Sequence, residues 1–323
     1  MDSRNNNNNQ DGPGLMTGKE KKKEKKYYGK LLVLIIFILI FIEYYAYVFE
    51  VMVKYINQKN FYLILTLLTI FHILVLLLLT SFISTMLTNP GEIPLYWGFY
   101  IGDDDYKRKR YCLICNAFKP ERSHHCSVCN KCVLNMDHHC PWVDNCIGFY
   151  NRKFFMQLLF FVVILTIYVD ITEIYFVMDM CIKLFKQHVK YSEIFHFGFV
   201  IICYIAILVF TFIISMFLKF HLKLVLVNST TIESLDQEHK IENTKFNLGK
   251  RQNWEQVFGT EPLLWFFPLP TKSGRPEGDG LTWKVNNNPI GDSGIKSNDS
   301  KNIAINNLDN NMNNNENFSP ITK

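Results

Sequence analysis

The residues of this sequence best suited to chemistry are cysteines and histidines, which gather between Cys112 and Cys146. Seven of the nine cysteines lie in this stretch, together with four histidines. Three cysteine pairs are separated by two residues, namely Cys112/Cys115, Cys126/Cys129 and Cys129/Cys132. Such a gap lets two thiolates reach one tetrahedral ion while the backbone turns between them. The spacing therefore predicts a zinc-binding segment.

The potential ligands outnumber what two zinc ions need. Closed zinc sites take about four ligands each, so two of them would leave three of the eleven cysteines and histidines spare. The candidates are Cys112, Cys115, His124, His125, Cys126, Cys129, Cys132, His138, His139, Cys140 and Cys146. Spacing alone does not show which three are spare. The surplus indicates that something besides metal binding takes place here.

The order of these residues follows a specific pattern, Cys-x2-Cys-x9-His-Cys-x2-Cys-x2-Cys-x4-Asp-His-His-Cys-x5-Cys. It resembles the cysteine-rich domain of the DHHC protein S-acyltransferases, the palmitoyltransferase family. Pro141-Trp142-Val143-Asp144-Asn145 and Gly148-Phe149 follow as in that family. Because the match covers so many fixed positions, it is far more specific than a single Cys-x2-Cys.

The resemblance assigns the metal ligands. It implies two interleaved zinc sites, one held by Cys112, Cys115, His125 and Cys132 and the other by Cys126, Cys129, His139 and Cys146. Asp137, His138 and Cys140 would then be free of metal, and His124 would also be spare. Two closed sites would make a loop with few large apolar residues rigid, because the free energy of zinc binding becomes free energy of folding.

The resemblance implies an enzyme, a protein-cysteine S-palmitoyltransferase, in which Asp137, His138 and Cys140 are the reactive residues. A free thiol has a pKa near ~8.5, so an imidazole at His138 that takes the proton of Cys140 would increase the amount of nucleophile. Asp137 would orient and stabilise His138, as the third member of a triad does. The expected reaction has two steps: Cys140 takes a long fatty acyl chain, such as palmitoyl, from acyl-CoA and passes it to a cysteine thiol of a target protein.

Two other classes of protein remain as alternatives. A zinc-bound adaptor anchored in a membrane would use Cys140 as a ligand or an inert thiol. An ion or metal transporter would explain His72, Asp170 and Glu173 in apolar segments. These three follow no repeated pattern, and the two acidic residues lie toward the far end of their helix, where we expect water to be near.

Four apolar blocks must position the cysteine-rich stretch. They are Leu31–Val53, Phe61–Leu87, Phe154–Met178 and Phe195–Phe220. A helix needs about 20 residues to cross a bilayer, so each block is long enough. The sequence therefore predicts an all-α integral membrane protein with four transmembrane helices, and places a two-zinc domain at 88–153, between the second and third. Glu43 in the first block should face other helices.

Charge predicts the orientation. A lysine cluster between Lys19 and Lys30 precedes the first block, and the 88–153 loop holds nine lysines and arginines. By the positive-inside rule, both termini and this loop face the cytosol, where thiols also stay reduced. We expect a multi-pass protein of an endomembrane (Golgi or ER) or the plasma membrane. No cleavable signal peptide is expected.

The segments on either side of the four apolar blocks are polar and are not expected to cross the membrane. Residues 1–30 predict a disordered basic cytosolic arm, which is more typical of a topology or lipid signal than of nucleic-acid binding. Residues 221–270 form a cytosolic segment with Thr230-Thr231-Ile232-Glu233, which resembles the family's Thr-Thr-x-Glu motif and is expected to dock this segment on the zinc domain. Residues 271–323 form a disordered asparagine-rich tail. The expected partners are acyl-CoA, the lipid bilayer and membrane-associated proteins with cytosolic cysteines, without nucleic acid.

The chain departs from the family at two places. Thr244 stands where the family often has asparagine, ahead of Phe246-Asn247-Leu248-Gly249, and Asn89 replaces an aspartate before Pro90-Gly91. The segment Asn253–Gly259 also resembles the family, and Pro262–Pro268 is predicted to pack at the membrane interface. Cations such as Arg122, Lys131, Arg152 and Lys153 could attract the phosphates of CoA, although a solvated or lipid-facing charge is the favoured interpretation for each one separately.

Overall fold

The computed structural model describes residues 18–98, 110–186, 190–236, 244–269, 271 and 274–286. Side chains are described from Tyr28 onward, apart from a few positions near the gaps. The asparagine run, Lys107–Lys109 and the tail beyond Asn286 therefore lie outside the described residues.

Within these residues, four helices are long and apolar enough to cross a membrane. They are α1 (Gly18–Tyr45), continued by a π-helix (Ala46–Met52) and a short 3-10 turn (Val53–Tyr55), α2 (Phe61–Leu87), α4 (Arg152–Phe185) and α5 (Tyr191–Leu226). Their runs of Leu, Ile, Phe and Val favour a helix that satisfies its own backbone in lipid. The predicted four-helix membrane fold is confirmed. Helix α1 starts earlier than expected, inside the stretch for which the sequence predicts a disordered arm.

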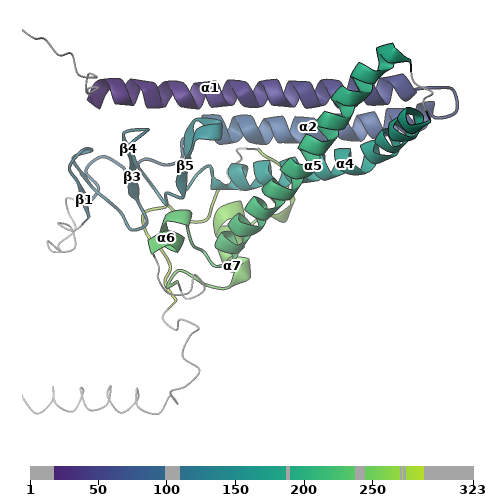
Figure 1. The fold of residues 1–323 in the computed structure, drawn as a ribbon. Helices are drawn as coiled ribbons and strands as arrows, with labels where there is room; N and C mark the ends of the chain where they lie inside the picture. The colour runs from purple at the N-terminus through teal and green to yellow at the C-terminus, as the bar shows by residue number, and fades with distance from the viewer. Residues whose placement is uncertain are drawn as a thin grey trace, which may run out of the picture.

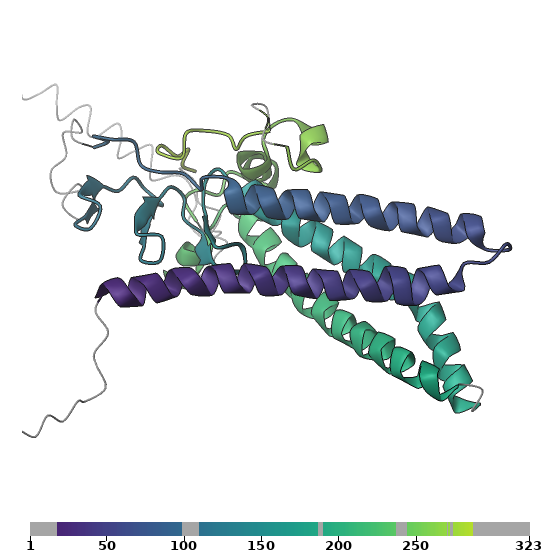
Figure 2. The ribbon, with the colours of Figure 1, turned by 90° about the horizontal axis from the view of Figure 1, so that it is seen from above.

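The helices pack as one elongated bundle, with α1 and α2 side by side and α5 crossing obliquely (Figures 1 and 2). In the most apolar window of α4, 56% of residues are buried, against 17–22% in the corresponding windows of the other three helices. Helix α4 is thus the central helix, and the others present their apolar side chains outward, as lipid-facing helices do. One buried cluster lies at the far end around Tyr47, Phe71 and Phe176.

Three ionisable residues of the spans differ in their surroundings. Glu173 is only 3% exposed, which corrects the expectation of nearby water at that depth. Asp170 accepts a hydrogen bond from Thr211 of α5 at 2.8 Å, and His72, an exposed residue of α2, bonds to Tyr44 of α1 at 2.9 Å.

The cysteine-rich stretch forms three small antiparallel hairpins at one end of the bundle (Figure 1). They pair β1 (Tyr111–Cys112) with β2 (Ala117–Phe118), β3 (His124–Cys126) with β4 (Lys131–Val133), and β5 (His138–Cys140) with β6 (Asn145–Ile147). Asn116, Asn130 and Asn135 adopt positive φ angles of 51°, 56° and 45° in the turns. Asparagine tolerates this left-handed backbone better than most residues.

Buried amides join the hairpins to the bundle. The Asn145 side chain donates to the carbonyls of Thr85, Met86 and Thr88 at the end of α2. Asn151 donates to the carbonyls of Thr85 and Cys146. These bonds satisfy carbonyls that α2 leaves without helical partners and fix β6 against the bundle.

The turn after α2 forms although Asn89 replaces the aspartate that the family has there. Asn89 Oδ1 accepts the backbone N–H of Gly91 at 3.0 Å, so the amide forms the local turn in place of the family's carboxylate.

Helix α1 extends past the bundle alongside the hairpins (Figures 1 and 2). It contacts the short turn Pro141–Val143 that follows Cys140. A Cβ atom at Gly29 would lie 2.0 Å from Asp144 Oδ1, so only glycine fits this approach without a shift. The basic start of α1 is thereby held next to the third hairpin.

The C-terminal segment folds back on the hairpins through α6 (Thr231–Asp236), α7 (Lys250–Phe258) and a 3-10 turn (Pro262–Trp265). The prediction of a disordered tail from residue 271 is wrong for its first part. Lys153 donates to the carbonyl of Gly274, and Trp283 packs against Phe149 and Phe246. A tryptophan provides enough apolar area to hold such a segment in place.

We predict that Asn145→Ala lowers the thermal midpoint of unfolding, because buried carbonyls lose their donor at about 1–3 kcal/mol for an unsatisfied group. The measurement is thermal unfolding of the purified protein in detergent. Asn57→Ala is the control, since Asn57 makes its bonds in an exposed turn where water replaces them. Equal midpoints for the two variants would contradict the role of Asn145.

Candidate functional site

Two groups of cysteines and histidines converge in the hairpins. In the first, the ligand atoms of Cys112, Cys115, His125 and Cys132 all lie within 4.8 Å of one another, and in the second the same holds for Cys126, Cys129, His139 and Cys146. These are the two sets that the family resemblance implies.

Strand geometry explains how the two groups interleave. In β3, neighbouring residues point to opposite faces, so His125 joins the first group and Cys126 the second. Across the hairpins, His125 is paired with Cys132 and His139 with Cys146. Each pair of facing residues therefore supplies two ligands to one group.

The distances fit tetrahedral zinc. His125 Nδ1 lies 3.2 Å from Cys115 Sγ and 3.6 Å from Cys112 Sγ. His139 Nδ1 lies 3.4 Å from Cys129 Sγ and 3.7 Å from Cys146 Sγ. The bond lengths of a zinc site place sulfur and nitrogen ligands about 3.5 Å apart. Three thiols and one imidazole per group form a Cys₃His donor set, which is suited to two structural zinc ions.

Asp137, His138 and Cys140 lie outside the two Cys₃His groups and form a separate cluster. His138 Nδ1 donates to Asp137 Oδ2 at 2.7 Å. His138 and Cys140 are two positions apart on β5, so they share one face of the strand while His139 points to the other. The Cys140 side chain interacts with the His138 ring. Because Nδ1 is used by Asp137, Nε2 is the His138 nitrogen that can exchange a proton with the thiol.

The Asp137 carboxylate is completely enclosed, and its partners come from distant segments. Oδ2 accepts the Thr231 hydroxyl at 2.7 Å and Oδ1 the Thr231 N–H at 3.1 Å. Arg152 Nη2 lies 3.3 Å from Oδ1 and His221 Nδ1 lies 3.9 Å from Oδ2. Burial opposes ionisation, but the charge of Arg152 and the hydrogen bond from His138 outweigh it and hold the pKa of Asp137 far below its usual range.

The same carboxylate controls the charge of His138. Burial lowers the pKa of His138, whereas the interactions with Asp137 and Cys140 raise it, to about 9. The Asp137 carboxylate therefore stabilises the protonated form of His138 beside Cys140.

A second buried ion pair docks the Thr-Thr-x-Glu segment on the hairpins. Arg122 donates from Nε and Nη2 to Glu233 at 2.7 and 2.8 Å, and also to Asn228. Its guanidinium carbon packs over the rings of both Phe246 and Trp283, 4.3 and 4.4 Å from their centroids. Bidentate pairing and ring stacking are the contacts that arginine makes best.

Glu233 also caps the N-terminus of α6. Glu233 accepts the N–H of Thr230 at 2.9 Å, and the Thr230 hydroxyl accepts the N–H of Glu233 at 3.2 Å. This reciprocal pair is a capping box. It presents Thr231 to Asp137.

Cys140 lies where the hairpins meet the bundle. It is 6% exposed and belongs to an apolar cluster with Leu78 and Phe82 of α2 and Phe155 and Leu158 of α4. The thiol is therefore surrounded by side chains suited to contact a hydrocarbon chain.

Three of the four cations that could attract CoA phosphates are committed elsewhere. Arg122, Arg152 and Lys153 are 2–3% exposed and are bound to the segments that follow α5. Lys131 is paired with Glu92 at the surface. The three buried residues are thus neither solvated nor lipid-facing charges, and they stabilise the docking of the C-terminal segment.

Sequence reasoning missed His221. Its ring packs against Phe155 and Phe217, with centroids 5.1 and 4.5 Å away, and lies 5.7 Å from the His138 ring. In the sequence it is one polar residue among lysines at a helix end, so no pattern distinguishes it. Thr244 stands where the family often has asparagine. Its Oγ1 accepts the N–H of Phe246 at 3.1 Å, so the hydroxyl provides a local polar contact.

Comparisons with known proteins agree with this geometry. Residues 105–238 match a family model described as DHHC palmitoyltransferase. "Probable protein S-acyltransferase 13" of Arabidopsis thaliana is 34% identical over 231 residues, covering 64% of this chain and 73% of the relative. "Palmitoyltransferase ZDHHC20" of Homo sapiens is 31% identical over 268 residues, covering 72% of this chain and 71% of the relative.

We predict that Thr231→Val destabilises the protein by about 1–3 kcal/mol, because a buried oxygen of Asp137 loses its hydroxyl donor. Thr231→Ser retains the hydroxyl and should restore most of the stability. Denaturant unfolding in detergent measures both variants. If Val and Ser unfold alike, the hydroxyl of Thr231 does not support Asp137.

Proposed function

Because this chain belongs to the DHHC palmitoyltransferase family, we propose that it uses acyl-CoA as donor and Cys140 as the carrier of the acyl chain. The chain is a protein-cysteine S-palmitoyltransferase. The observation that carries the proposal is the cluster of Asp137, His138 and Cys140, which lies on β5 and the residue before it and is separate from both Cys₃His groups.

The proposed reaction exchanges one thioester for another. His138 Nε2 takes the proton of Cys140, and the thiolate attacks the carbonyl carbon of the acyl-CoA thioester. The bond from this carbon to the sulfur of CoA breaks, and His138 returns the proton to the departing thiolate. In the second half a target cysteine attacks the acyl-Cys140 thioester in the same way, which regenerates the Cys140 thiol.

Each residue of the cluster has a defined part in this proposal. Asp137 holds His138 by Nδ1, so that Nε2 faces the thiol, and stabilises the imidazolium. Thr231, Arg152 and His221 keep Asp137 in place. The reacting bonds are of one kind, so positioning and proton transfer are the main tasks.

The two metal-ligand groups are proposed to hold structural zinc. Cys112, Cys115, His125 and Cys132 would bind one ion, and Cys126, Cys129, His139 and Cys146 the other. Zinc in such closed sites supplies cross-links that stabilise the fold. The hairpins need them, because the buried apolar cluster around Cys126 and Cys146 is small.

The position of Cys140 suits a substrate that remains in lipid. Burial of a palmitoyl chain contributes about 0.8 kcal/mol per methylene, so the chain stays in the bilayer and the thiol must meet it there. We propose that the hairpin end of the bundle and both termini face the cytosol, where acyl-CoA and target cysteines are available, in an endomembrane or the plasma membrane. The apolar cluster around Cys140 supports this arrangement.

We predict that an acyl-CoA with a labelled chain leaves a hydroxylamine-labile adduct on the purified protein and that Cys140→Ser abolishes it. Cys181→Ser is the matched control, since Cys181 is an exposed thiol on α4. Labelling is read after gel separation with and without hydroxylamine. A labile adduct that persists in Cys140→Ser would reject the nucleophile. No adduct on any variant would favour a zinc-bound adaptor. Zinc flux across a membrane that persists in Cys140→Ser would favour a transporter.

We predict that His138→Ala lowers the rate of acylation by roughly 10²–10⁴-fold, the usual contribution of a general base, while zinc stays at about two ions per chain. His139→Ala should instead lose zinc and stability together. Zinc is measured by elemental analysis and stability by thermal unfolding. Loss of zinc from His138→Ala would show that the ligand assignment is wrong.

A further inference from the structure

Beyond α7 and the turn that follows it, residues 274–286 form a strap that runs back toward the hairpins (Figure 2). At its start, the carbonyl of Gly274 accepts a hydrogen bond from Lys153 Nζ, near the beginning of α4, at 3.0 Å. At its end, the side chain of Asn286 donates to the carbonyl of Asn247 at 3.0 Å. The strap is therefore fastened both to the bundle and to the segment that precedes α7.

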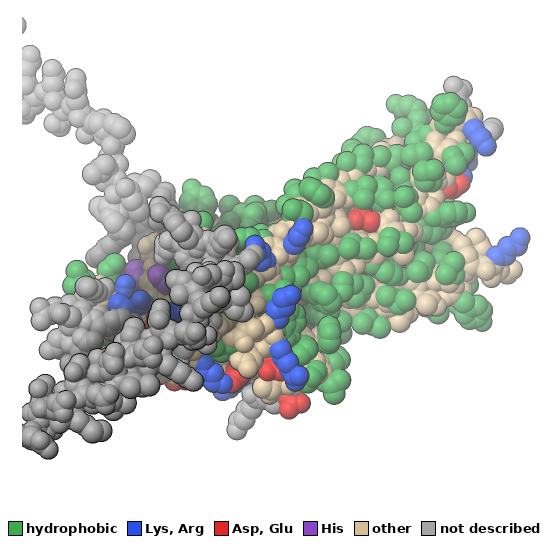
Figure 3. Space-filling view, turned by 90° about the horizontal axis from the view of Figure 1, so that it is seen from below, with side chains coloured by type: hydrophobic (Ala, Val, Ile, Leu, Met, Phe, Trp, Pro, Cys, Tyr) green, Lys and Arg blue, Asp and Glu red, His purple; other side chains and the backbone are tan. Residues whose placement is uncertain are grey.

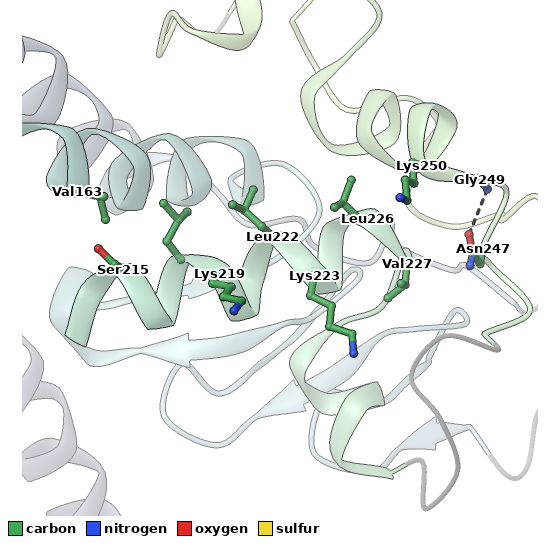
Figure 4. Close-up of a pocket in the computed structure, with 11 residues that line it drawn as sticks. Val163, Ser215, Lys219, Leu222, Lys223, Leu226, Val227, Asn247, Gly249 and Lys250 are labelled. Atoms are coloured by element: carbon green, nitrogen blue, oxygen red, sulfur yellow. Dashed lines mark hydrogen bonds between the residues drawn. The ribbon is translucent and has the colours of Figure 1, made fainter. Parts of the chain in front are cut away.

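Asn247 connects the end of the strap to α5. Its Oδ1 accepts hydrogen bonds from the N–H of Gly249 at 3.1 Å and from the side chain of Asn253 at 2.8 Å. Figure 4 shows the first of these bonds, where the start of α7 lies beside the end of α5. Asn253 also donates to the carbonyl of Leu226, the last residue of α5, at 2.8 Å. The strap thus ends on a hydrogen-bond network that is itself fixed to the bundle.

The middle of the strap contacts the hairpin side through two residues. Gly280 has a φ angle of 73°, and a Cβ atom there would lie 2.9 Å from Cγ of Phe149, so this close approach requires glycine. The centroid of the Trp283 ring lies 5.9 Å from that of Phe149 and 6.1 Å from that of Phe246. It also lies 4.4 Å from the guanidinium carbon of Arg122. Trp283 therefore packs directly on the buried ion pair that docks the segment after α5.

Arg122 connects the two sides of the Asp137 site. On the hairpin side, its carbonyl accepts the N–H of Met136, the residue before Asp137, at 3.1 Å. On the other side, its guanidinium donates to Glu233 at 2.7 and 2.8 Å, and Glu233 lies two residues beyond Thr231 in α6. Thr231 donates twice to the Asp137 carboxylate. The position of Arg122 therefore determines how the carboxylate and its hydroxyl donor meet.

The ring of Trp283 helps to keep water away from this ion pair. Arg122 is 3% exposed, and an ion pair is much stronger in such surroundings than in water. The aromatic face also attracts the cation itself, most strongly when the cation is desolvated. Without the indole, water would reach the guanidinium and compete for its bonds to Glu233. The cap that Glu233 provides for α6 would then loosen, and Thr231 with it.

We propose that Trp283 is a positioning residue of the acyltransferase, which keeps the pair of Arg122 and Glu233 closed and so holds Thr231 on Asp137. The inference rests on the proposed role of Asp137 in acylation. Because the strap joins the start of α4, the segment before α7 and the hairpins, these parts must be docked together before the carboxylate has all its partners. Trp283 acts through Arg122 and not on the reacting groups.

The first test is amide hydrogen exchange of residues 230–236 in the full chain in detergent, which reports local opening of α6. Charged side chains gather at this end of the molecule, where the apolar surface of the helices ends (Figure 3), so water has access to it. Trp283→Ala should exchange at least about tenfold faster than the unchanged protein. Trp283→Phe should restore most of the protection, because among the described residues Trp283 Nε1 has no hydrogen-bond partner to lose. Val285→Ala, at a position of the strap that is 44% exposed, is the control and should leave exchange unchanged. Equal exchange in Trp283→Ala and Trp283→Phe would overturn the proposal.

The second test is a double-mutant cycle that asks whether Trp283 acts through Arg122. The measured rate is that of acyl-Cys140 formation from labelled palmitoyl-CoA. Trp283→Ala should lower the maximal rate roughly tenfold and leave the KM for palmitoyl-CoA within about threefold, because the strap affects the docking of Thr231 and not the donor. When Arg122→Gln is already present, Trp283→Ala should lower the rate by less than about a further twofold. Losses that multiply in the double variant would show that Trp283 acts independently of Arg122 and would overturn the proposal.

Failure of this inference and failure of the proposed function give different results. If the unchanged protein forms no adduct on Cys140, the proposed function is wrong, and hydrogen exchange still tests the role of Trp283 by itself. If the adduct forms and Trp283→Ala matches the unchanged protein in exchange and rate, the inference is wrong and the function stands. Gly280→Ala displaces the strap at Phe149 and should also speed exchange of residues 230–236, so the test does not depend on Trp283→Ala folding normally. Unchanged exchange in Gly280→Ala would show that the strap does not hold α6 and would overturn the inference.

Discussion

The buried carboxylate of Asp137 is the interaction on which the arrangement of this protein depends. A charge without solvent exposure is costly unless hydrogen bonds and opposite charges surround it. Here those partners are His138 on the hairpin, Arg152 at the start of α4, and Thr231 after α5. They are far apart in the chain, so the carboxylate is satisfied only when hairpin, bundle and C-terminal segment are docked together. The requirement that orients His138 also assembles the fold around it.

Strand geometry separates the structural chemistry of the hairpins from the reactive chemistry. Neighbouring side chains on a strand point to opposite faces, so three consecutive residues of β5 can serve two purposes. His139 faces the ligand group that contains Cys126 and Cys146, whereas His138 and Cys140 face the bundle. A metal ion that rigidifies His139 would therefore fix its two neighbours without contacting them. This explains why spacing suggests a surplus of ligands but does not identify it.

Much of the fold could be predicted from sequence because its causes are local. Four apolar blocks give four helices, and the asparagines of the hairpin turns have the backbone freedom that the turns need. The partners of Asp137 had weaker signals. Thr231 was identified by a motif, Arg152 was expected to be solvated, to face lipid or to attract CoA, and His221 was overlooked. Charge and residue type do not show which helix face meets a hairpin. Trp283, within a segment predicted to be disordered, packs on Arg122 through a contact that no periodicity reveals.

The burial of Cys140 fits a thioester carrier that must be protected from water. Cys140 is 6% exposed and belongs to the apolar cluster that includes Phe82 and Phe155, so an acyl group on it would lie in this cluster, and hydrolysis would require water to enter there. Trp142, two residues away, is 53% exposed and has the amphipathic character of side chains at membrane interfaces. A target thiol that reaches the carrier must then approach along this interface. In the proposed mechanism, selection of targets would depend on their closeness to the membrane, because the apolar cluster that contains the thiol is built largely from the membrane helices α2 and α4.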